Sequence, residues 1–541
     1  MKRWGAIVAL VVVVLIAHGA VLTQWWLWDD PQVLYGVMRY SLADSLTKPE
    51  VWRAQSGTNF VPLLLTSYEL DYALFGLEPR GYYAHHLAMF VTAMVLLFLY
   101  VRTFASQWVA LLAAVTAALS APAWTAASLL MDRHYVEGVP LAIGALLLFR
   151  ASRDKPWLAV LGAGAYLLAA LEKEVFAPLP LLVLAQDLVA WGRGRPMGPI
   201  GPMGEPVPPS AAPRGPRGPI GPMSPVVLLR NLAACSVAAV LYLAWRLVML
   251  GAAGGYGRGR NTTELLSLPV EVWHRVIGPL ALVAALLALA LLILKVRSVQ
   301  AVAVIVLATI FSLLPITFLR DLDHRYVFVP MCVLVVLAAT AAVNRIGTIV
   351  FAGFCVTMVI GGFLHRATLV PSLRLMQSHG LYLWNAPPNA RPILTGPNGW
   401  YTEGIRWMRK AAKGDDAPHA IASLPGVYLS GADVAVMGDA NEVRAAVAAI
   451  GRDRDPSMPL HVSFEHDSTI ARWKFAPHEP GVRWYFMTLP SYELIELEAE
   501  GWTRYPTHFR APSYEAMPEA GVFRIVRMKN GRWNVSPELK W

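Results

Sequence analysis

The sequence predicts a mainly α-helical, polytopic membrane helix bundle followed by a C-terminal exported α/β domain. The chain of 541 residues is 56% hydrophobic and only 15% charged, and its mean hydropathy is +0.46. These values are typical of an integral membrane protein. Apolar runs recur through residues 1–365, where we place the transmembrane module. Mixed sequence with many turn residues follows over 366–541, which indicates a separate soluble domain.

A membrane-spanning helix needs about 20 apolar residues, and about eleven runs approach that length. The predicted spans are 5–23, 86–104, 107–125, 136–150, 156–171, 175–191, 226–250, 276–294, 299–318, 326–343 and 347–364. The first run also resembles a cleaved secretory signal, because Lys2 and Arg3 precede it and small residues end it. Its length favours a span that is retained.

Basic residues gather in the connections on one side of the predicted bundle. They are Lys2, Arg3, Arg102, Arg150, Arg153, Lys155, Arg193, Arg195, Arg214, Arg217, Arg230, Lys295, Arg297 and Arg345. The excess of Lys and Arg on the cytoplasmic side of membrane proteins predicts a cytoplasmic N-terminus and an exported C-terminus. The net charge of +10 then faces anionic membrane lipids, so we do not expect nucleic-acid binding.

Two long connections have distinct compositions. Residues 24–85 are rich in Trp and Tyr yet carry several acids, which predicts an exported loop of short helices lying along the membrane interface. Residues 192–225 contain Gly-Pro-Ile-Gly-Pro-Met twice, at 198–203 and 218–223. The three-residue period of collagen does not persist there. This segment is predicted to be a flexible cytoplasmic linker.

The exported domain of residues 366–541 is long enough to bury its own core. Helical spacing is seen at 401–412 and 440–451, and strand-like runs are seen at 426–430, 459–464, 483–488 and 521–527. A small α/β domain fits this mixture.

Polar residues cluster at the predicted outer ends of the spans. They are Asp29, Asp30, Asp132, Arg133, His134, Tyr135, Glu137, Glu172, Lys173, Glu174, Arg258, Arg260, Arg320, Asp321, Asp323, His324, Arg325 and Tyr326. A solvated loop explains any one of these clusters. A membrane enzyme with a lipid-linked substrate needs such groups together on one membrane face.

Several short motifs occur in an order that resembles the GT-C superfamily of integral-membrane glycosyltransferases, most closely the protein O-mannosyltransferase-like members. They are Asp29-Asp30 after the first span, Asn59-Phe-Val-Pro-Leu, Leu74-Phe-Gly-Leu-Glu-Pro-Arg-Gly-Tyr-Tyr, Lys173-Glu174 and Arg325-Tyr-Val-Phe-Val-Pro. The resemblance covers most of residues 1–365. The chain departs from the pattern at Asp30, where Glu is usual, and at His86, where Asn is frequent.

The resemblance implies transfer of a sugar from a polyprenyl phosphate or diphosphate to a protein, lipid or glycan acceptor on the exported face, with inversion. Asp29 matches the first acid of the pair and is the candidate general base, a role that accelerates reactions by about 10²–10⁴-fold. Asp30 is expected to orient it, to bind the sugar or to assist a metal ion. A divalent ion, Mg²⁺ or Mn²⁺, is left open at this pair, because the sequence has no tight metal-ligand signature.

The leaving phosphate needs fixed cations, and arginine and lysine supply them. Arg325 and Lys173 are the first candidates, followed by Arg133 and His324. We expect the acid pair and the cations at 173 and 325 to line one cavity. The further candidates are Glu137, Glu174, Tyr326, Asp132 and Arg258. The alternative role for Arg325 is a membrane anchor, and for Lys173 it is an ion pair with a neighbouring glutamate.

Two other functional classes stay open. A transporter or flippase for a lipid-linked or anionic substrate would place charged groups near the middle of the bilayer. The acids of this chain instead cluster at the predicted outer ends of the spans. In a non-catalytic scaffold with an exported binding domain, the acid pair would have no catalytic role.

Overall fold

The fold is described from a computed structural model of the chain. The described residues are 3–56, 59–193, 225–251, 267–268, 270–272, 299–319, 322–342, 345–388, 390, 392–394, 399–415, 417–418, 421, 423–430, 435–436, 440–466, 470–489, 492, 494–504 and 522–540. They fall into two compact units. Unit 1 comprises Met1–Leu22, Phe60–Leu64 and Tyr83–Thr368, and unit 2 comprises Thr23–Asn59, Leu65–Tyr82 and Leu369–Trp541.

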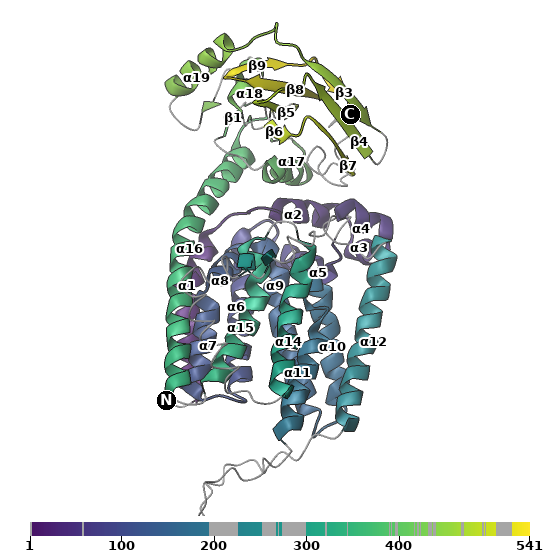
Figure 1. The fold of residues 1–541 in the computed structure, drawn as a ribbon, viewed down its shortest axis with the longest axis vertical. Helices are drawn as coiled ribbons and strands as arrows, with labels where there is room; N and C mark the ends of the chain where they lie inside the picture. Colours follow the sequence, from purple (N-terminus) through teal and green to yellow (C-terminus); the bar gives the residue numbers. More distant parts are fainter. Residues whose placement is uncertain are drawn as a thin grey trace, which may run out of the picture. The chain divides into compact units, whose positions relative to one another are not determined.

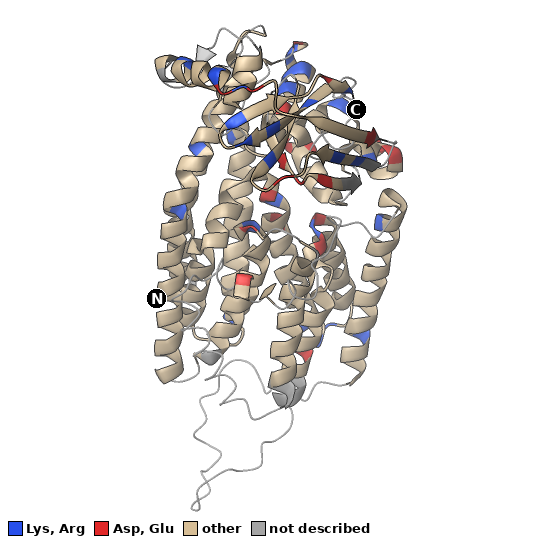
Figure 2. Cartoon of the chain, turned by 45° about the horizontal axis from the view of Figure 1, so that its top comes forward, with Lys and Arg blue, Asp and Glu red and all other residues tan. Residues whose placement is uncertain are grey.

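Unit 1 is a bundle of apolar helices. The elements that lie wholly or mainly in unit 1 are α1 (Arg3–His18), η1 (Gly19–Thr23), α6 (Pro79–Val101), α7 (Gln107–Leu119), α8 (Ala121–Ser128), η2 (Leu130–Asp132), α9 (Arg133–Ala151), α10 (Leu158–Glu172), η3 (Glu174–Phe176), α11 (Leu179–Arg193), α12 (Pro225–Leu250), α14 (Val299–Leu313), η4 (Leu314–Phe318), η5 (His324–Val327), α15 (Phe328–Ala341) and α16 (Arg345–Asn385). The helices α10, α11, α12 and α14 run side by side (Figure 1). Few positions along the helices of the bundle are coloured as charged residues (Figure 2).

Apolar helices occupy ten of the eleven predicted spans, and the eleventh, 276–294, lies outside the described residues. Among the described helices, α1, α6, α12 and α16 are each long and apolar enough to cross a membrane, and the bent pair α7 and α8 makes a fifth if it counts as one span. The chain is therefore an integral membrane protein. The predicted count of about eleven spans stays a prediction.

A sharp bend divides the run 107–125, which the sequence analysis treats as one segment. The helices α7 and α8 meet at an angle of 60°. Ser120 between them is extended, and Pro122 lies in the first turn of α8. Proline has no N–H and is tolerated in the first turn of a helix, where it accompanies a helix start rather than the middle of a span. The prediction of one uninterrupted segment is therefore wrong at Ser120.

A buried polar network joins the C-terminal end of α9 to the neighbouring helices α11 and α12. Asp187 of α11 is fully buried, and its two oxygens accept from Arg153 Nη2 and Asn231 Nδ2, each at 3.0 Å. Ser152 Oγ donates to Asn231 Oδ1 at 3.0 Å. One carboxylate thereby joins the turn after α9 to α11 and α12.

Asp187→Ala is expected to lower the free energy of unfolding of the protein in detergent by about 3 kcal/mol, because it removes the buried carboxylate that pairs with Arg153 and accepts from Asn231. Thermal unfolding of the purified protein measures this change. Asp154→Ala is the matched control, since Asp154 is an exposed acid in the same turn. Equal stability of the two variants would show that the network does not hold the helices together.

Unit 2 contains the short helices expected in residues 24–85. They are α2 (Asp30–Arg39), α3 (Leu42–Thr47), α4 (Pro49–Gln55) and the larger part of α5 (Pro62–Phe75). The helix α17 (Gly399–Lys413) packs against α2. Segments that are far apart in the sequence are therefore neighbours in this unit.

Arg409 fastens α17 to the end of α16. Its guanidinium donates to the backbone oxygens of Leu383 and Ala386 at 2.9 and 2.6 Å. It also forms a two-pronged pair with the carboxylate of Asp415, at 3.0 and 2.7 Å. This arginine holds the pKa of the Asp415 carboxyl below its ordinary value. The stabilisation from the pair is therefore present above the ordinary carboxyl pKa and is lost as the pH falls through the lowered value.

The C-terminal part of unit 2 is built on antiparallel strands. The elements are β1 (Pro392–Ile393), α18 (Leu424–Ser430), β2 (Ala435–Val436), α19 (Ala440–Arg452), β3 (His461–His466), β4 (Ile470–Ala476), β5 (Val482–Thr488), β6 (Leu494–Leu497), β7 (Glu500–Arg504), β8 (Val522–Lys529), β9 (Arg532–Val535) and β10 (Leu539–Lys540). One sheet has the order β10-β8-β5-β6 with β9 beside β8, a second has the order β3-β4-β7, and β1 pairs in parallel with β2. A core cluster comprises Phe475, Trp484, Phe486, Phe523 and Ile525.

Most of the elements expected in this part are present. The predicted helices 401–412 and 440–451 correspond to α17 and α19, and three of the four predicted strands correspond to β3, β5 and β8. The strand predicted at 426–430 is wrong, because this run belongs to the helix α18. Its apolar side chains pack against α19 and the sheet, so burial rather than alternation explains their composition.

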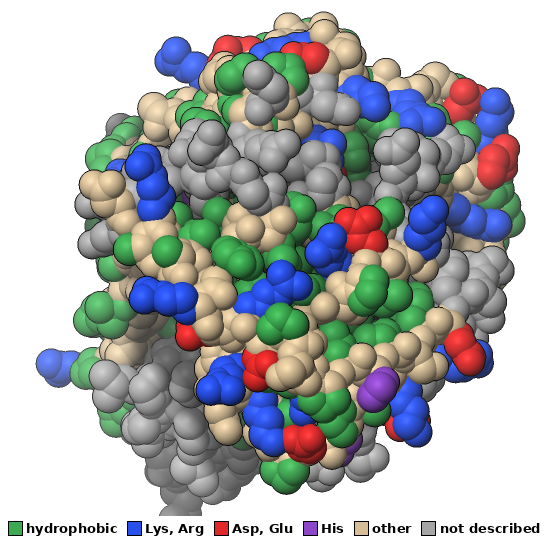
Figure 3. Space-filling model, turned by 90° about the horizontal axis from the view of Figure 1, so that it is seen from above, with side chains coloured by type: hydrophobic (Ala, Val, Ile, Leu, Met, Phe, Trp, Pro, Cys, Tyr) green, Lys and Arg blue, Asp and Glu red, His purple; other side chains and the backbone are tan. Residues whose placement is uncertain are grey.

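The exposed charges of this part are largely paired with each other. Arg483 pairs with Glu496, and Arg524 pairs with Glu538 at 2.9 Å. On the face in Figure 3, basic and acidic side chains are interspersed with hydrophobic ones. The described residues on that face form no large patch of a single sign of the kind that nucleic acids require.

Candidate functional site

The acid pair lies in unit 2, at the turn that leads into α2. Trp28 has a positive φ of 48°, a conformation that is uncommon outside glycine and that turns the chain just before the pair. Asp29 is the N-cap of α2, but its side chain makes no capping hydrogen bond to that helix, and Asp30 is the first helical residue. The two neighbouring carboxylates therefore have different surroundings.

Asp30 is fully buried and held on both oxygens. Its Oδ1 accepts from the Tyr68 hydroxyl at 2.8 Å, and its Oδ2 accepts from the Leu27 backbone N–H at 2.9 Å. Asp29 is half-buried, and its Oδ1 accepts from the Trp400 indole N–H at 2.6 Å. Asp30 thus stabilises the turn, and Asp29 is the member of the pair that solvent reaches.

Tyr401, next to Trp400 on α17, supports the same turn. Its hydroxyl donates to the Trp26 backbone oxygen at 2.8 Å. Burial raises the pKa of this hydroxyl well above its ordinary value, and the nearby charge of Asp30 adds to the shift. Tyr401 therefore stays protonated and remains a donor at neutral pH.

The surroundings of the acid pair do not form a typical divalent-metal site. Such sites usually bring several oxygen or nitrogen ligands together. Both oxygens of Asp30 already accept hydrogen bonds, and the described residues include no group of three or more His, Cys, Asp or Glu side chains positioned to share an ion. No step of the reaction proposed below is routed through a metal.

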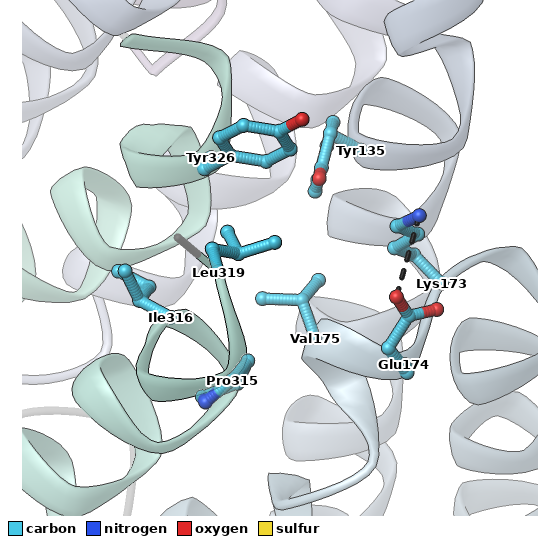
Figure 4. Close-up of a pocket in the computed structure, with 8 residues that line it drawn as sticks. All are labelled: Tyr135, Lys173, Glu174, Val175, Pro315, Ile316, Leu319 and Tyr326. Carbon is cyan, nitrogen blue, oxygen red and sulfur yellow. Dashed lines mark ion pairs between the residues drawn. The ribbon is translucent and has the colours of Figure 1, made fainter. Parts of the chain in front are cut away.

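The candidate cations lie in unit 1, and Lys173 lines a small pocket there. Lys173 is extended between α10 and η3 and is almost fully buried. The pocket, of about 20 Å³, has room for about one water molecule. Its lining residues are Tyr135, Lys173, Glu174, Val175, Pro315, Ile316, Leu319 and Tyr326 (Figure 4).

Glu174 binds two cations beside this pocket. Its carboxylate lies 3.3 Å from Lys173 Nζ, as the dashed line in Figure 4 marks, and 3.7 Å from Arg246 Nη1. The predicted alternative of an ion pair for Lys173 is thus present in the structure. The phosphate-binding role of Lys173 stays a prediction.

Arg325 contacts Tyr326, which lines the pocket. Its guanidinium carbon lies 5.0 Å from the Tyr326 ring centroid, and Nη2 donates to the Tyr326 hydroxyl at 3.3 Å. Asp132 Oδ1 lies 4.0 Å from Nη1. Lys173 and Tyr326 line the same pocket. The structure therefore brings the two leading candidate cations to one region of unit 1.

The other predicted residues of unit 1 have different neighbours. Arg133 is fully buried, and its Nε lies 3.5 Å from Glu137 Oε1, which also lies 3.9 Å from His85 Nε2. His324 stacks on His365, with ring centroids 3.9 Å apart. The phosphate-binding roles of Arg133 and His324 stay predictions.

Four residues of the predicted clusters lie outside the described residues, namely Arg258, Arg260, Arg320 and Asp321. His86, where the sequence departs from the pattern, is buried, and its Nε2 lies 2.9 Å from the Ala126 backbone oxygen. One ring nitrogen of His86 therefore has a partner within the bundle, and Nδ1 is buried without a hydrogen bond to the described residues.

The sequence analysis overlooked several residues that the structure places at these sites. Arg246 lies inside the apolar run 226–250, and an ionisable residue in such a run is itself a signal of a functional site. Tyr68 and Trp400 gave no comparable signal. Nothing in a single sequence links residue 400 to residue 29.

The described helices define an integral membrane protein of mainly helical architecture. No protein family and no curated protein matches the sequence. Two solved structures that resemble the chain are both GT-C glycosyltransferases. ArnT from Cupriavidus metallidurans bound to undecaprenyl phosphate is 13% identical, with 82% of this chain and 88% of that chain covered and a TM-score of 0.44. The apo oligosaccharyltransferase of Archaeoglobus fulgidus is 12% identical, with 76% and 64% covered and a TM-score of 0.41.

The chain therefore spans just under two thirds of the archaeal oligosaccharyltransferase. The function proposed below rests on the side chains of this chain.

Proposed function

We propose that the protein transfers a sugar from a polyprenyl-phosphate-linked or polyprenyl-diphosphate-linked donor to an acceptor on the exported side of the membrane, with inversion. The observation that carries this proposal is the unequal acid pair. Asp30 is buried and held by two hydrogen bonds, whereas Asp29 is half-buried and accepts from the Trp400 indole N–H. A fixed and accessible carboxylate is what a general base requires.

Asp29 takes the proton of the acceptor as the acceptor atom attacks the anomeric carbon of the sugar. The bond between that carbon and the phosphate oxygen breaks in the same displacement, and its electron pair leaves with the lipid phosphate. A single displacement of this kind inverts the configuration at the anomeric carbon. Asp30 keeps the turn, and hence Asp29, in place.

Lys173 and Arg325 stabilise the charge that develops on the departing phosphate. Both side chains are largely buried, with exposed fractions of 5% and 14%, so their charges act in a medium that weakens them less than water does. The planar guanidinium of Arg325 fits two phosphate oxygens, and the ammonium of Lys173 acts as a compact charge. Arg246 shares Glu174 with Lys173 and raises the positive charge at that pocket.

The proposal includes the topology that the sequence predicts. Residues 1–365 form the catalytic membrane module in the inner membrane of a bacterium, with the N-terminus in the cytoplasm. Residues 366–541 form the exported domain. The acceptor is a protein, a lipid or a glycan that reaches the exported face.

Deletion of the gene tests the proposal, because the strain is expected to lack one hexose or pentose on an exported protein or envelope glycan. Mass spectrometry of exported proteins and envelope glycans from the deletion and parent strains measures this loss. Restoring the wild-type gene is the control and should restore the sugar. Identical glycans in the two strains would overturn the proposal.

A further inference from the structure

The helix α17 approaches the acid turn unusually closely. Gln32 of α2 donates from Nε2 to the Trp400 backbone oxygen at 2.5 Å. A Cβ on Gly404 would lie 2.3 Å from the amide carbon of Gln32, so a larger residue there would require the Gln32 side chain to move. The hydrogen bond from Gln32 joins the first turn of α17 to the helix that follows Asp29.

The Trp400 indole is in turn held in place by its surroundings. Its ring meets the ring of Trp407 edge to face, with centroids 6.0 Å apart. The next residue, Tyr401, is fully buried and bonded to the Trp26 backbone oxygen. An indole anchored at both backbone and ring presents its N–H in one direction.

That N–H meets Asp29 Oδ1 at 2.6 Å. The Asp29 side chain makes no capping bond to its own helix, so α2 does not fix the orientation of this carboxylate. A hydrogen bond to an ionised oxygen is shorter and stronger than one between neutral groups. Because a carboxylate has two oxygens, one can be held while the other accepts a proton.

We propose that Trp400 is a positioning residue, which orients the carboxylate of Asp29 for proton abstraction; this inference rests on the proposed function. The C-terminal segment is then part of the catalytic apparatus, because the residue that orients the base follows α16. A C-terminal region that only bound the acceptor would alter the use of the acceptor and leave the base unaffected.

Trp400→Phe tests this role, since it keeps an aromatic ring and removes only the N–H and part of the ring area. We expect kcat to fall about 10- to 100-fold, the effect of losing a hydrogen bond to a charged group, with little change in the KM for donor or acceptor. The assay uses the purified full-length chain in liposomes, a panel of radiolabelled undecaprenyl-phosphate-linked hexoses and pentoses, and envelope from the deletion strain as the acceptor.

Two further variants separate positioning from a structural effect. Trp473→Phe removes an indole N–H that donates to the Glu498 backbone oxygen in the strand part of the same unit and should keep kcat within about twofold of the wild type. Trp400→His retains a ring N–H donor and should recover part of the rate lost in Trp400→Phe. Thermal unfolding of each variant shows whether the fold is intact.

Combining the changes shows whether Trp400 acts through Asp29. In an Asp29→Ala background, Trp400→Phe should cause no further loss of the residual rate, because neighbours in one interaction are not additive. A wild-type kcat in Trp400→Phe, or an equal loss in both backgrounds, would overturn the inference. Loss of transfer in Asp29→Asn with a wild-type rate in Trp400→Phe would leave the proposed function standing and remove only this inference.

Discussion

Asp29→Asn is expected to lower the rate of sugar transfer by about 10²- to 10⁴-fold, the usual contribution of a general base. The amide has almost the shape of the carboxylate, and its oxygen can still accept from the Trp400 N–H. Asparagine is also as good an N-cap as aspartate, so α2 should form normally. Transfer to deletion-strain envelope measures the rate, and thermal unfolding shows that the variant is folded.

Two other acids in unit 2 sharpen this test. Glu50→Gln neutralises an exposed acid of α4 and should leave transfer unchanged. Asp30→Asn should instead lower stability, because an amide has one oxygen and two donors have to be satisfied at this position. A wild-type rate in Asp29→Asn would show that another group removes the proton.

Arg325→Ala is expected to weaken binding of the lipid phosphate by about 10- to 100-fold, since hydrogen bonds to charged groups contribute about 1.5–3 kcal/mol. Arg325→Lys should recover part of this affinity, because it keeps the charge but loses the planar fork. Binding of undecaprenyl phosphate to the purified protein is the measurement. It reports the leaving group directly and does not require the sugar to be known.

The control for Arg325 is Arg345→Ala, which removes an exposed arginine at the start of α16 and should leave binding unchanged. Unchanged binding in Arg325→Ala together with reduced insertion in the membrane would favour the alternative role of an anchor. The two outcomes are distinguishable because insertion is measured in membranes and binding in purified protein.

The sequence predicted where the apolar helices lie but not always where they end. The run 226–250 and the helix α12 (Pro225–Leu250) nearly coincide, because both ends of this helix coincide with a change in polarity. The predicted span 347–364 ends where hydropathy falls, yet α16 continues to Asn385. Hydropathy reports the solvent around a helix and not its backbone hydrogen bonds, so it misses the polar continuation.

The sequence predicted part of the candidate site and missed the contacts that distinguish its members. The order of Asp29-Asp30, Lys173-Glu174 and Arg325-Tyr326 along the chain identified the charged groups. Their different roles depend on burial and on partners such as Tyr68 and Trp400 that are remote in sequence. The resemblance ranked Asp29 above Asp30 as the base, but a single sequence does not encode these pairings in any local pattern, so the partners of the two acids come only from the folded structure.

The most direct test of the central claim measures binding and transfer on the same preparation of Asp29→Asn. Binding of undecaprenyl phosphate should stay within about twofold of the wild type, whereas transfer should fall by at least about 10²-fold, because a base acts in the reaction and not in binding of the donor lipid. Transfer at the wild-type rate, or a loss of transfer fully explained by weaker binding, would contradict the assignment of Asp29 as the general base.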